Sequence, residues 1–243
     1  MAEPHRQVAS FVHHRARLTE GQQAAWERWW PVRGRDVTDL LDGAAAYDPA
    51  AWFGRSAPLV LEIGSGMGES TAALAAAEPD VDVVAVEVFE PGIAALLMRI
   101  ADAELTNLQV LRGDAVALLR ECVPESTLAG IRIFFPDPWP KRRHRKRRLV
   151  QPDFVALAAA RLRPGGTLHM ATDWDDYAAQ MQAAADGEPR LENTAVGQPG
   201  GSTPRPGWRP VTKFEARART EGRDVHDLVY RRCYSGEGSD HTR

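Results

Sequence analysis

A glycine-rich turn follows directly after the first short apolar run that could form a buried strand. Residues 59–63 (LVLEI) lead into Gly64-Ser65-Gly66-Met67-Gly68, and a helical pattern begins at Glu69. In an open parallel sheet, ligands bind beyond the carboxyl ends of the strands, and glycine permits a tight turn and a close approach of the backbone. Glu87 ends the next apolar run, where a carboxylate can accept hydrogen bonds from two ribose hydroxyls. The spacing predicts a site for a nucleoside cofactor.

The acids around this turn favour one class of cofactor. A dinucleotide fingerprint has its third glycine where Glu69 stands, and an acid there places negative charge where a pyrophosphate needs the helix N-terminus. S-adenosylmethionine carries a cationic sulfonium and no phosphate, so it tolerates both Glu69 and the preceding Glu62. We therefore expect S-adenosylmethionine, with contacts at Gly64 and Gly66. A dinucleotide, or a tight turn without a ligand, remains an alternative.

Asp114 closes the third apolar run, in the sequence Arg112-Gly113-Asp114-Ala115. A carboxylate at a strand end can accept a hydrogen bond from an adenine amino group. It can equally cap the helix that is expected to begin at Ala115. Both interpretations stay open, and both can hold together.

The fourth apolar run, residues 131–135 (IRIFF), ends in Pro136-Asp137-Pro138-Trp139-Pro140. Prolines at alternate positions stiffen the chain, which predicts that Asp137 is held outside the sheet edge and faces the cofactor crevice. The indole of Trp139 offers a face on which a base can stack. The alternative is a rigid turn with a buried tryptophan.

Positive charge is concentrated in the segment that follows. Seven of the eight residues Lys141–Arg148 (KRRHRKRR) are Lys or Arg, whereas the other 235 residues hold 23 Lys and Arg against 33 Asp and Glu. A basic patch on an acidic body indicates a local polyanion contact, because a phosphate footprint depends on local charge density and not on the net charge of −3. A solvated surface face is the alternative. We therefore expect Asp137 and Trp139 to hold one base while the basic segment binds the phosphates of the same nucleic-acid strand.

Apolar runs alternate with helical patterns from Leu59 onward. Strands are predicted over residues 59–63, 81–87, 108–111, 131–135, 167–171 and 228–234. Helices are predicted over residues 69–77, 92–103, 115–122, 152–162, 174–185 and 213–221. The alternation is typical of βαβ units, and continuous apolar runs are typical of strands covered on both faces. We expect an α/β, Rossmann-like fold with a mostly parallel sheet and helices on both faces.

The segments outside this pattern predict the domain organisation. Residues 1–58 are expected to be an N-terminal extension, partly helical (over 21–30) or flexible. Residues 59–235 are expected to form the main domain and residues 236–243 a disordered tail. The stretch 197–210 (GQPGGSTPRPGWRP) is rich in proline and glycine and predicts a loop.

The composition argues against several classes of protein. The 243 residues are 44% hydrophobic and 26% charged, as in ordinary soluble proteins. No apolar run approaches the ~20 residues that span a bilayer, and the N-terminus lacks the apolar core of a secretory signal. Cys122 and Cys233 are the only cysteines and stand far apart, which favours neither a disulfide framework nor a zinc site. We expect a cytoplasmic protein without a metal, acting as a monomer or a homodimer.

Several of these motifs resemble one known family. Phe135–Leu149 (FPDPWPKRRHRKRRL) resembles the signature of the bacterial tRNA (guanine-N7)-methyltransferases, the TrmB family. Ser10–Gln22 is similar to its N-terminal segment, Glu62–Gly68 to its cofactor loop, and Ala171–Trp174 and Arg209–Glu215 to its later motifs. The first of these motifs is highly specific, whereas many methyltransferases share the loop. The resemblance covers most of the chain and implies a class I S-adenosylmethionine-dependent methyltransferase fold and methyl transfer to N7 of guanosine 46 in the tRNA variable loop.

The resemblance also assigns roles to individual residues. It implies cofactor contacts at Glu62, Glu87, Asp114 and Asp137. It implies substrate contacts at Lys141, Asp173, Thr212, Lys213, Phe214 and Glu215, and RNA binding by Arg143, His144, Arg145, Lys146, Arg147 and Arg148. Asp137 is the expected catalytic residue, as a group that orients the base and accepts no proton. The chain departs from the family pattern at Ser65, Ala218 and Arg223. Ala218 and Arg223 lie outside the implied contacts, so they bear on the end of the 213–221 helix more than on the reaction.

Two other functions stay open. Asp137-Pro138-Trp139 loosely resembles the Asp-Pro-Pro-aromatic motif of enzymes that methylate the amino group of adenine or cytosine, although Trp139 stands where that motif has proline. A non-catalytic RNA-binding protein on a methyltransferase fold is the second. The intact glycine turn, Glu87 and Asp137 favour an enzyme.

Overall fold

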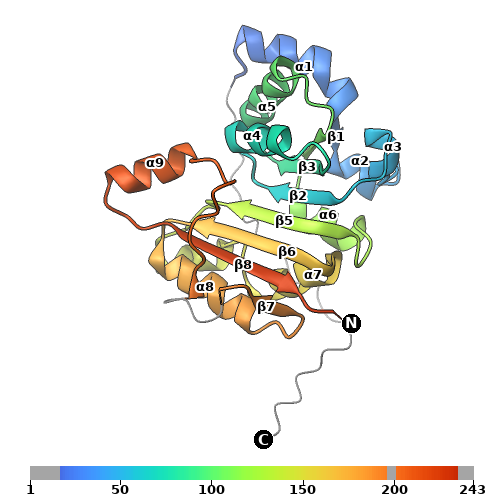
Figure 1. Cartoon of the computed structure of the whole chain (residues 1–243). Helices are drawn as coiled ribbons and strands as arrows, with labels where there is room; N and C mark the ends of the chain where they lie inside the picture. Colours follow the sequence, from blue (N-terminus) through green and yellow to red (C-terminus); the bar gives the residue numbers. More distant parts are fainter. Residues whose placement is uncertain (1–16, 196–200, 235–243) are drawn as a thin grey trace, which may run out of the picture.

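A single sheet organises the chain in the computed structural model, which describes residues 17–195 and 201–234 (Figure 1). The strand order is β1-β4-β3-β2-β5-β6-β8-β7. The strands are β1 (Gly34–Asp36), β2 (Leu59–Ile63), β3 (Asp82–Glu87), β4 (Leu108–Arg112), β5 (Leu128–Phe134), β6 (Leu162–Thr172), β7 (Leu191–Asn193) and β8 (His226–Arg232). All pairings from β1 to β6 are parallel, and β8 is antiparallel to both of its neighbours. The predicted mostly parallel sheet is confirmed.

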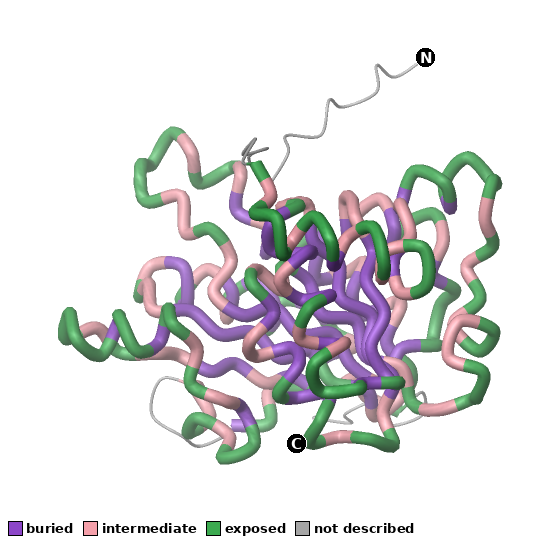
Figure 2. The backbone as a smooth tube through the Cα atoms, turned by 90° about the horizontal axis from the view of Figure 1, so that it is seen from above, coloured by how far each residue is buried: buried purple, intermediate pink, exposed green. Residues whose placement is uncertain are grey.

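Helices cover both faces of this sheet. They are α1 (Glu20–Arg33), α2 (Val37–Leu41), α3 (Pro49–Phe53), α4 (Glu69–Ala77), α5 (Glu90–Asp102), α6 (Ala115–Glu121), α7 (Pro152–Arg161), α8 (Asp175–Asp186) and α9 (Lys213–Thr220), with a 3₁₀ helix η1 (Arg142–Arg147). In β3, Val84 and Val86 belong to the core cluster that includes residues of α2, α6, α7 and α8, whereas Val83 and Ala85 belong to the cluster with α4 and α5. The strands are therefore buried on both sides, as the continuous apolar runs predicted, and form the centre of the molecule (Figure 2).

The described part of the N-terminal segment is built into the sheet. Residues 34–36 form β1, which pairs in parallel with β4 at the sheet edge. The helix α1 begins with a capping box in which Thr19 and Gln22 bond to each other's backbone N–H, and it packs against α5. Sequence analysis did not predict β1, because three residues (GRD) are too few to show a strand pattern.

Other predicted segments lie wholly or partly outside the described residues. These are residues 197–200 of the predicted loop, the predicted tail 236–243, and the first part of the Ser10–Gln22 motif. Within the described ranges, no helix is both long and apolar enough to cross a membrane. The same ranges contain no group of three or more His, Cys, Asp or Glu side chains that could hold a metal ion.

Candidate functional site

A cavity of about 740 Å³ opens at the carboxyl ends of β2, β3, β4 and β5. The chain passes from β2 to β3 on one side, and β5 pairs with β2 on the other, so this is the point at which the strand order reverses. The volume lies in the range of small-molecule sites in proteins. The fold therefore creates a ligand-sized crevice where the sequence predicted one.

The glycine turn forms the floor of this cavity and allows unusually close packing. Gly68 has a φ of 76°, and a Cβ added there would lie 2.6 Å from Leu96. At the start of α5, a Cβ added to Gly92 would lie 2.3 Å from the carbonyl oxygen of Gly66. Both contacts are too short for any side chain, so glycine at these positions lets α5 press directly against the turn.

Glu87 ties the turn to the end of β3. Its Oε2 accepts a hydrogen bond from the backbone N–H of Gly66 at 2.8 Å. Its Oε1 accepts from the N–H groups of Val88 and Phe89 at 2.7 and 2.9 Å. Three backbone donors therefore fix a carboxylate that also lines the cavity.

Glu62 is a buried acid with one unused oxygen. Its Oε1 accepts a hydrogen bond from the Thr71 hydroxyl at 2.6 Å, whereas Oε2 is buried and has no hydrogen-bond partner within the described part of the chain. Burial raises the pKa of Glu62, against the opposing effects of the Thr71 hydrogen bond and the positive charge of Arg132. A buried acceptor left unused beside a cavity suits a ligand that brings a cationic donor.

Asp114 has the capping role that the sequence left open. Its Oδ1 accepts hydrogen bonds from the backbone N–H groups of Val116 at 2.7 Å and Ala117 at 3.4 Å, at the start of α6. The same residue lines the cavity. The cap therefore places the carboxylate at the ligand side, and the adenine contact stays a prediction.

Asp137 lines the cavity from the end of β5, between two residues with unusual backbone conformations. Phe135 has a φ of 53° and Trp139 a φ of 43°. For bulky side chains this left-handed region costs roughly 1–3 kcal/mol per residue, and such outliers cluster at functional sites. The alternate prolines therefore belong to a strained segment that presents Asp137.

The surroundings of Trp139 differ from the predicted base-stacking position. Its ring is not among the residues that line the cavity. The Arg147 guanidinium lies 4.8 Å above the ring, and His144 meets it edge-on with centroids 6.0 Å apart. Trp139 thus packs with the basic segment. The phenylalanines that line the cavity are Phe89, Phe134, Phe135 and Phe214.

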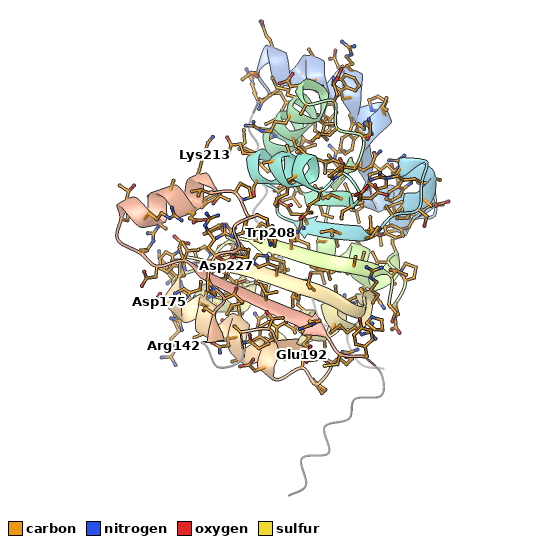
Figure 3. All side chains as sticks on the ribbon, viewed as in Figure 1. Arg142, Asp175, Glu192, Trp208, Lys213 and Asp227 are labelled. Carbon is orange, nitrogen blue, oxygen red and sulfur yellow. The ribbon has the colours of Figure 1, made fainter. Side chains whose placement is uncertain are left out.

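The basic segment divides into surface residues and one anchor. Arg148 is 2% exposed, and its guanidinium donates to the Pro138 carbonyl at 2.8 Å, to Gln180 Oε1 at 2.9 Å and to Asp176 Oδ2 at 2.8 Å. Its predicted role as an RNA contact is therefore replaced by a structural role, because its donors already bond to α8 and to the proline segment. The side chains of η1 are exposed or half-buried, and Arg142 lies beside α8 in Figure 3.

His144 differs from its cationic neighbours. Partial desolvation lowers the pKa of its imidazole, and the nearby charges of Arg143, Arg147, Lys141 and Lys146 lower it further. These effects favour the neutral form of the ring. Its expected contribution to phosphate binding is a hydrogen bond and not a charge.

The start of α9 forms the opposite wall of the cavity. Thr212 caps the helix by accepting from the Glu215 N–H at 3.0 Å, and Thr212, Lys213 and Phe214 all line the cavity. The Lys213 ammonium lies 2.6 Å from Glu69 Oε1 at the start of α4. Figure 3 labels Lys213 on α9. Figure 1 shows α9 standing apart from the helices that cover the sheet, on the side where β5 and β6 end.

Glu215 lies in the interior, away from the predicted substrate contact. It is 1% exposed and pairs with Arg209 Nη1 at 2.8 Å. The fully buried Arg209 also donates to both carboxylate oxygens of Asp227 at 2.8 Å, and His169 Nε2 bonds to Asp227 at 2.7 Å. Burial alone would raise the pKa of Asp227, yet hydrogen bonds from His169 and Arg209 lower it. Burial lowers the pKa of His169, so this network is a neutral imidazole beside an Arg–carboxylate cluster that anchors α9.

Besides Glu215, two further predicted substrate residues lie outside the cavity lining. Lys141 is exposed just before η1. The Asp173 carboxylate pairs with Arg223 Nη2 at 2.7 Å. Arg223 is one of the departures from the family pattern, so this pair ties that departure to a predicted substrate residue. Sequence reasoning missed Arg209 and Phe135, and the conspicuous signal at Phe135 was only its position before Pro136.

Comparisons with known proteins identify the family of this chain. A family model described as "Putative methyltransferase" (Methyltransf_4) matches residues 56–228. The chain is 52% identical to a tRNA (guanine-N(7)-)-methyltransferase of Methylococcus capsulatus, covering 95% of this chain and 96% of that protein. It is 49% identical to the protein of the same name from Streptomyces coelicolor, covering 96% and 83%. A crystal structure of the antibiotic-resistance methyltransferase Kmr shares the fold, with a TM-score of 0.51 and 17% identity over 78% of this chain and 95% of that chain. The chain therefore belongs to the tRNA (guanine-N7)-methyltransferase family.

Proposed function

We propose that this protein transfers a methyl group from S-adenosylmethionine to N7 of a guanine in tRNA, at guanosine 46 of the variable loop. The observation that carries the proposal is an acidic cavity at the reversal of strand order that is followed directly in the chain by an exposed basic segment. Five acids and two bases line the cavity: Glu62, Glu69, Glu87, Asp114 and Asp137, with Lys213 and Arg217. The name that the relatives carry supports the same reaction.

The charges of the cavity suit the proposed cofactor. S-adenosylmethionine supplies the methyl group on a cationic sulfonium and leaves as S-adenosylhomocysteine. The buried and unused Oε2 of Glu62 fits its ammonium group. Glu87 would hold the ribose hydroxyls and Asp114 the adenine amino group. A pyrophosphate would meet mostly negative charge here, which speaks against a dinucleotide.

The reaction asks for alignment and negative potential. The N7 lone pair forms the new bond to the methyl carbon while the sulfur–carbon bond breaks and its electron pair stays on sulfur. Positive charge thereby passes to the purine, and no proton moves, because N7 carries none. Alignment of two reactants can supply up to roughly 7–11 kcal/mol in favourable cases, and fixed negative groups near the purine stabilise the developing charge.

Asp137 suits this task best among the lining acids. Its carboxylate would accept hydrogen bonds from the guanine N1–H and amino group, and it would reject adenine, which presents an acceptor where guanine has N1–H. The strained backbone on both sides holds it in place. Asp173 and Glu215, which the resemblance gives as substrate contacts, pair with Arg223 and Arg209, so we assign the recognition of the base to Asp137.

The exposed basic segment would bind the tRNA backbone. It begins four residues after Asp137, so phosphates bound there would lie close to the base in the cavity. Arg145 and Lys146 also line a shallow hollow of about 360 Å³ beside α8. Arg148 holds the segment to α8 through Asp176.

Methyl transfer from labelled cofactor to unmodified tRNA, followed by cleavage at N7-methylguanosine, tests the proposal. We expect one cut, at position 46, and none in a matched tRNA that carries adenosine there. Label in an exocyclic amino group would make the protein an amino-group methyltransferase. Cofactor binding without any transfer to tRNA would make it a non-catalytic RNA-binding protein.

A further inference from the structure

Two phenylalanine rings meet on the wall of the cavity. Phe135 follows β5, and Phe214 is the second residue of α9. Their ring centroids are 6.1 Å apart, and the ring planes differ by only 19°. Both residues line the cavity. Two segments far apart in the sequence thus contribute nearly parallel aromatic faces to one place.

Each ring is held in a position that stability alone does not favour. Phe214 is 62% exposed although it is a large apolar side chain. Phe135 has a φ of 53°, in the left-handed region that bulky residues rarely adopt. Its N–H donates to the Ala171 carbonyl at 2.8 Å, which fixes this conformation to the end of β6. Strained residues of this kind are typical of ligand clamps, and exposed apolar groups at a cavity are typical of binding surfaces.

One buried residue connects the two rings. The Arg209 guanidinium carbon lies 5.7 Å from the centroid of Phe135, and its Nη1 pairs with Glu215, the neighbour of Phe214. Asp227 holds Arg209 from the other side through two hydrogen bonds of 2.8 Å. Because Arg209 contacts both partners, α9 and the end of β5 are fixed relative to each other. Arg209 is therefore a positioning residue for the pair.

The rings also lie beside the group that would recognise the base. Phe135 stands two residues before Asp137, and Phe214 stands two residues after Thr212, and all four line the cavity. Proteins that hold a single base outside a nucleic-acid helix stack it on aromatic side chains and bond its edge to polar groups. The phenylalanines and Asp137 provide both kinds of contact. Trp139 is less suited, because it does not line the cavity.

We infer that Phe135 and Phe214 form a stacked aromatic pair, here called the clamp, whose exposed face stacks on the target guanine and stabilises the positive charge that methylation places on it. The inference rests on the proposed function. Aromatic faces attract cations more strongly than they attract neutral rings. The clamp therefore binds the methylated, cationic purine better than guanine, and part of this preference is already present in the transition state.

Substitutions that remove the aromatic face but keep apolar volume test the clamp. We expect Phe214→Leu and Phe135→Leu each to lower kcat/KM for tRNA by about 10-fold to 100-fold, which is the loss expected for one base–aromatic stack. The affinity for S-adenosylhomocysteine should stay within about twofold, because its expected contacts lie on the opposite wall. Phe214→Tyr keeps the stacking face and should retain activity. Tyr234→Leu alters a similarly exposed aromatic residue, 60% exposed and outside the cavity, and should change nothing.

A second measurement separates stacking on a cation from a general structural effect. Fully methylated tRNA and unmethylated tRNA are titrated against each variant in the presence of S-adenosylhomocysteine. The wild-type chain should favour the methylated tRNA, and both leucine variants should lose most of this preference. An altered fold alone would weaken both affinities equally.

The inference is overturned if the wild-type chain methylates N7 while both leucine variants keep its kcat/KM and its preference between the two tRNAs. It is also overturned if the leucine variants lose activity only in proportion to a loss of S-adenosylhomocysteine affinity. A wild-type chain that does not methylate N7 would instead refute the proposed function, so the two failures are distinguishable.

Discussion

The two walls of the cavity are built in different ways. On the wall formed by β2, β3 and β4, backbone N–H groups fix the acids: three donate to Glu87 and two to Asp114. On the wall formed by α9, side chains make the connections, through Lys213 to Glu69 and through Glu215 to Arg209. The first arrangement suits a small ligand that always has the same shape. The second suits a large substrate that must enter and leave.

The largest expected effect lies between the walls, at Asp137. Asp137→Ala should lower kcat by 10²-fold or more, the loss typical of a group that stabilises charge in the transition state. Asp137→Asn should lose less, because one amide oxygen still accepts a hydrogen bond.

The dependence of rate on pH checks the role of Asp137. We expect the wild-type rate to be flat from about pH 6 to 8.5, since N7 carries no proton for a base to remove. Carboxyl side chains in model peptides have pKa values of about 4. A rate that requires one deprotonation well above that value would make Asp137, or another group, a general base.

Glu87→Gln tests the wall on which backbone N–H groups fix the acids. The amide keeps the shape of the side chain but removes the charge and can accept fewer of the three backbone hydrogen bonds. Affinity for S-adenosylhomocysteine should fall by about 10-fold to 100-fold, as for the loss of a charged hydrogen bond. Calorimetric titration measures this. Glu192→Gln, on β7 and outside the cavity, is the matched control and should bind as the wild type does.

The basic segment contains both a buried arginine, Arg148, and surface arginines such as Arg143. Arg148→Gln removes a buried guanidinium with three partner residues and should lower the free energy of unfolding by about 2–3 kcal/mol. Arg143→Gln, on the surface, should change it by less than about 0.5 kcal/mol. Denaturant unfolding compares the two variants. Equal losses would show that Arg148 is no anchor.

The dependence of the free energy of unfolding on pH tests how far the buried Glu62 destabilises the protein. Burial raises the folded-state pKa of this carboxyl above its usual value of 4.5, so the folded protein holds the proton more tightly than the unfolded chain does. Its contribution to stability is complete below the unfolded pKa and is lost as pH rises through the folded pKa. Glu62→Gln should therefore be more stable than wild type at pH 8, by about 1–3 kcal/mol, without cofactor. This difference in the free energy of unfolding should shrink towards pH 4. A difference that stays constant with pH would show that the charge of Glu62 is not its cause.

The smallest expected effect concerns the exposed arginines. Neutralising Arg143 should reduce the slope of log affinity for tRNA against log salt by about 0.7–0.9, the value for one phosphate contact. The Arg148 variant, compared at a temperature where it is folded, should leave this slope unchanged. A slope that changes with Arg148 but not with Arg143 would reverse the two assignments.

Local patterns predicted the elements that bear on the cofactor. The predicted ranges 59–63 and 69–77 coincide with β2 and α4, because an apolar run, three glycines and an alanine-rich helix are each encoded within a few neighbouring residues. Asp114 was expected as a cap or a ligand and is a cap, since a capping residue acts on the next turn of the chain.

Residues whose partners are distant in sequence could not be predicted in the same way. Arg148 is one of eight consecutive residues of similar character, and its burial with bonds to Pro138 and to Gln180 on α8 distinguishes it. Glu215 follows directly after four residues that line the cavity, but it turns inward because Arg209 and Asp227 are buried behind it. The edge strand β1 depends on β4, more than 70 residues later. In each case tertiary contacts decide, and the sequence pattern carries no trace of them.

The contact between Gly92 and the Gly66 carbonyl determines where this site could be redesigned. Any side chain at position 92 would displace the turn, so the cavity has no room to grow towards α5. An enzyme that accepts donors with alkyl groups larger than methyl would have to gain its space from the α9 wall. Directed evolution towards such donors should therefore collect its substitutions between residues 211 and 217 and leave the glycine turn unchanged.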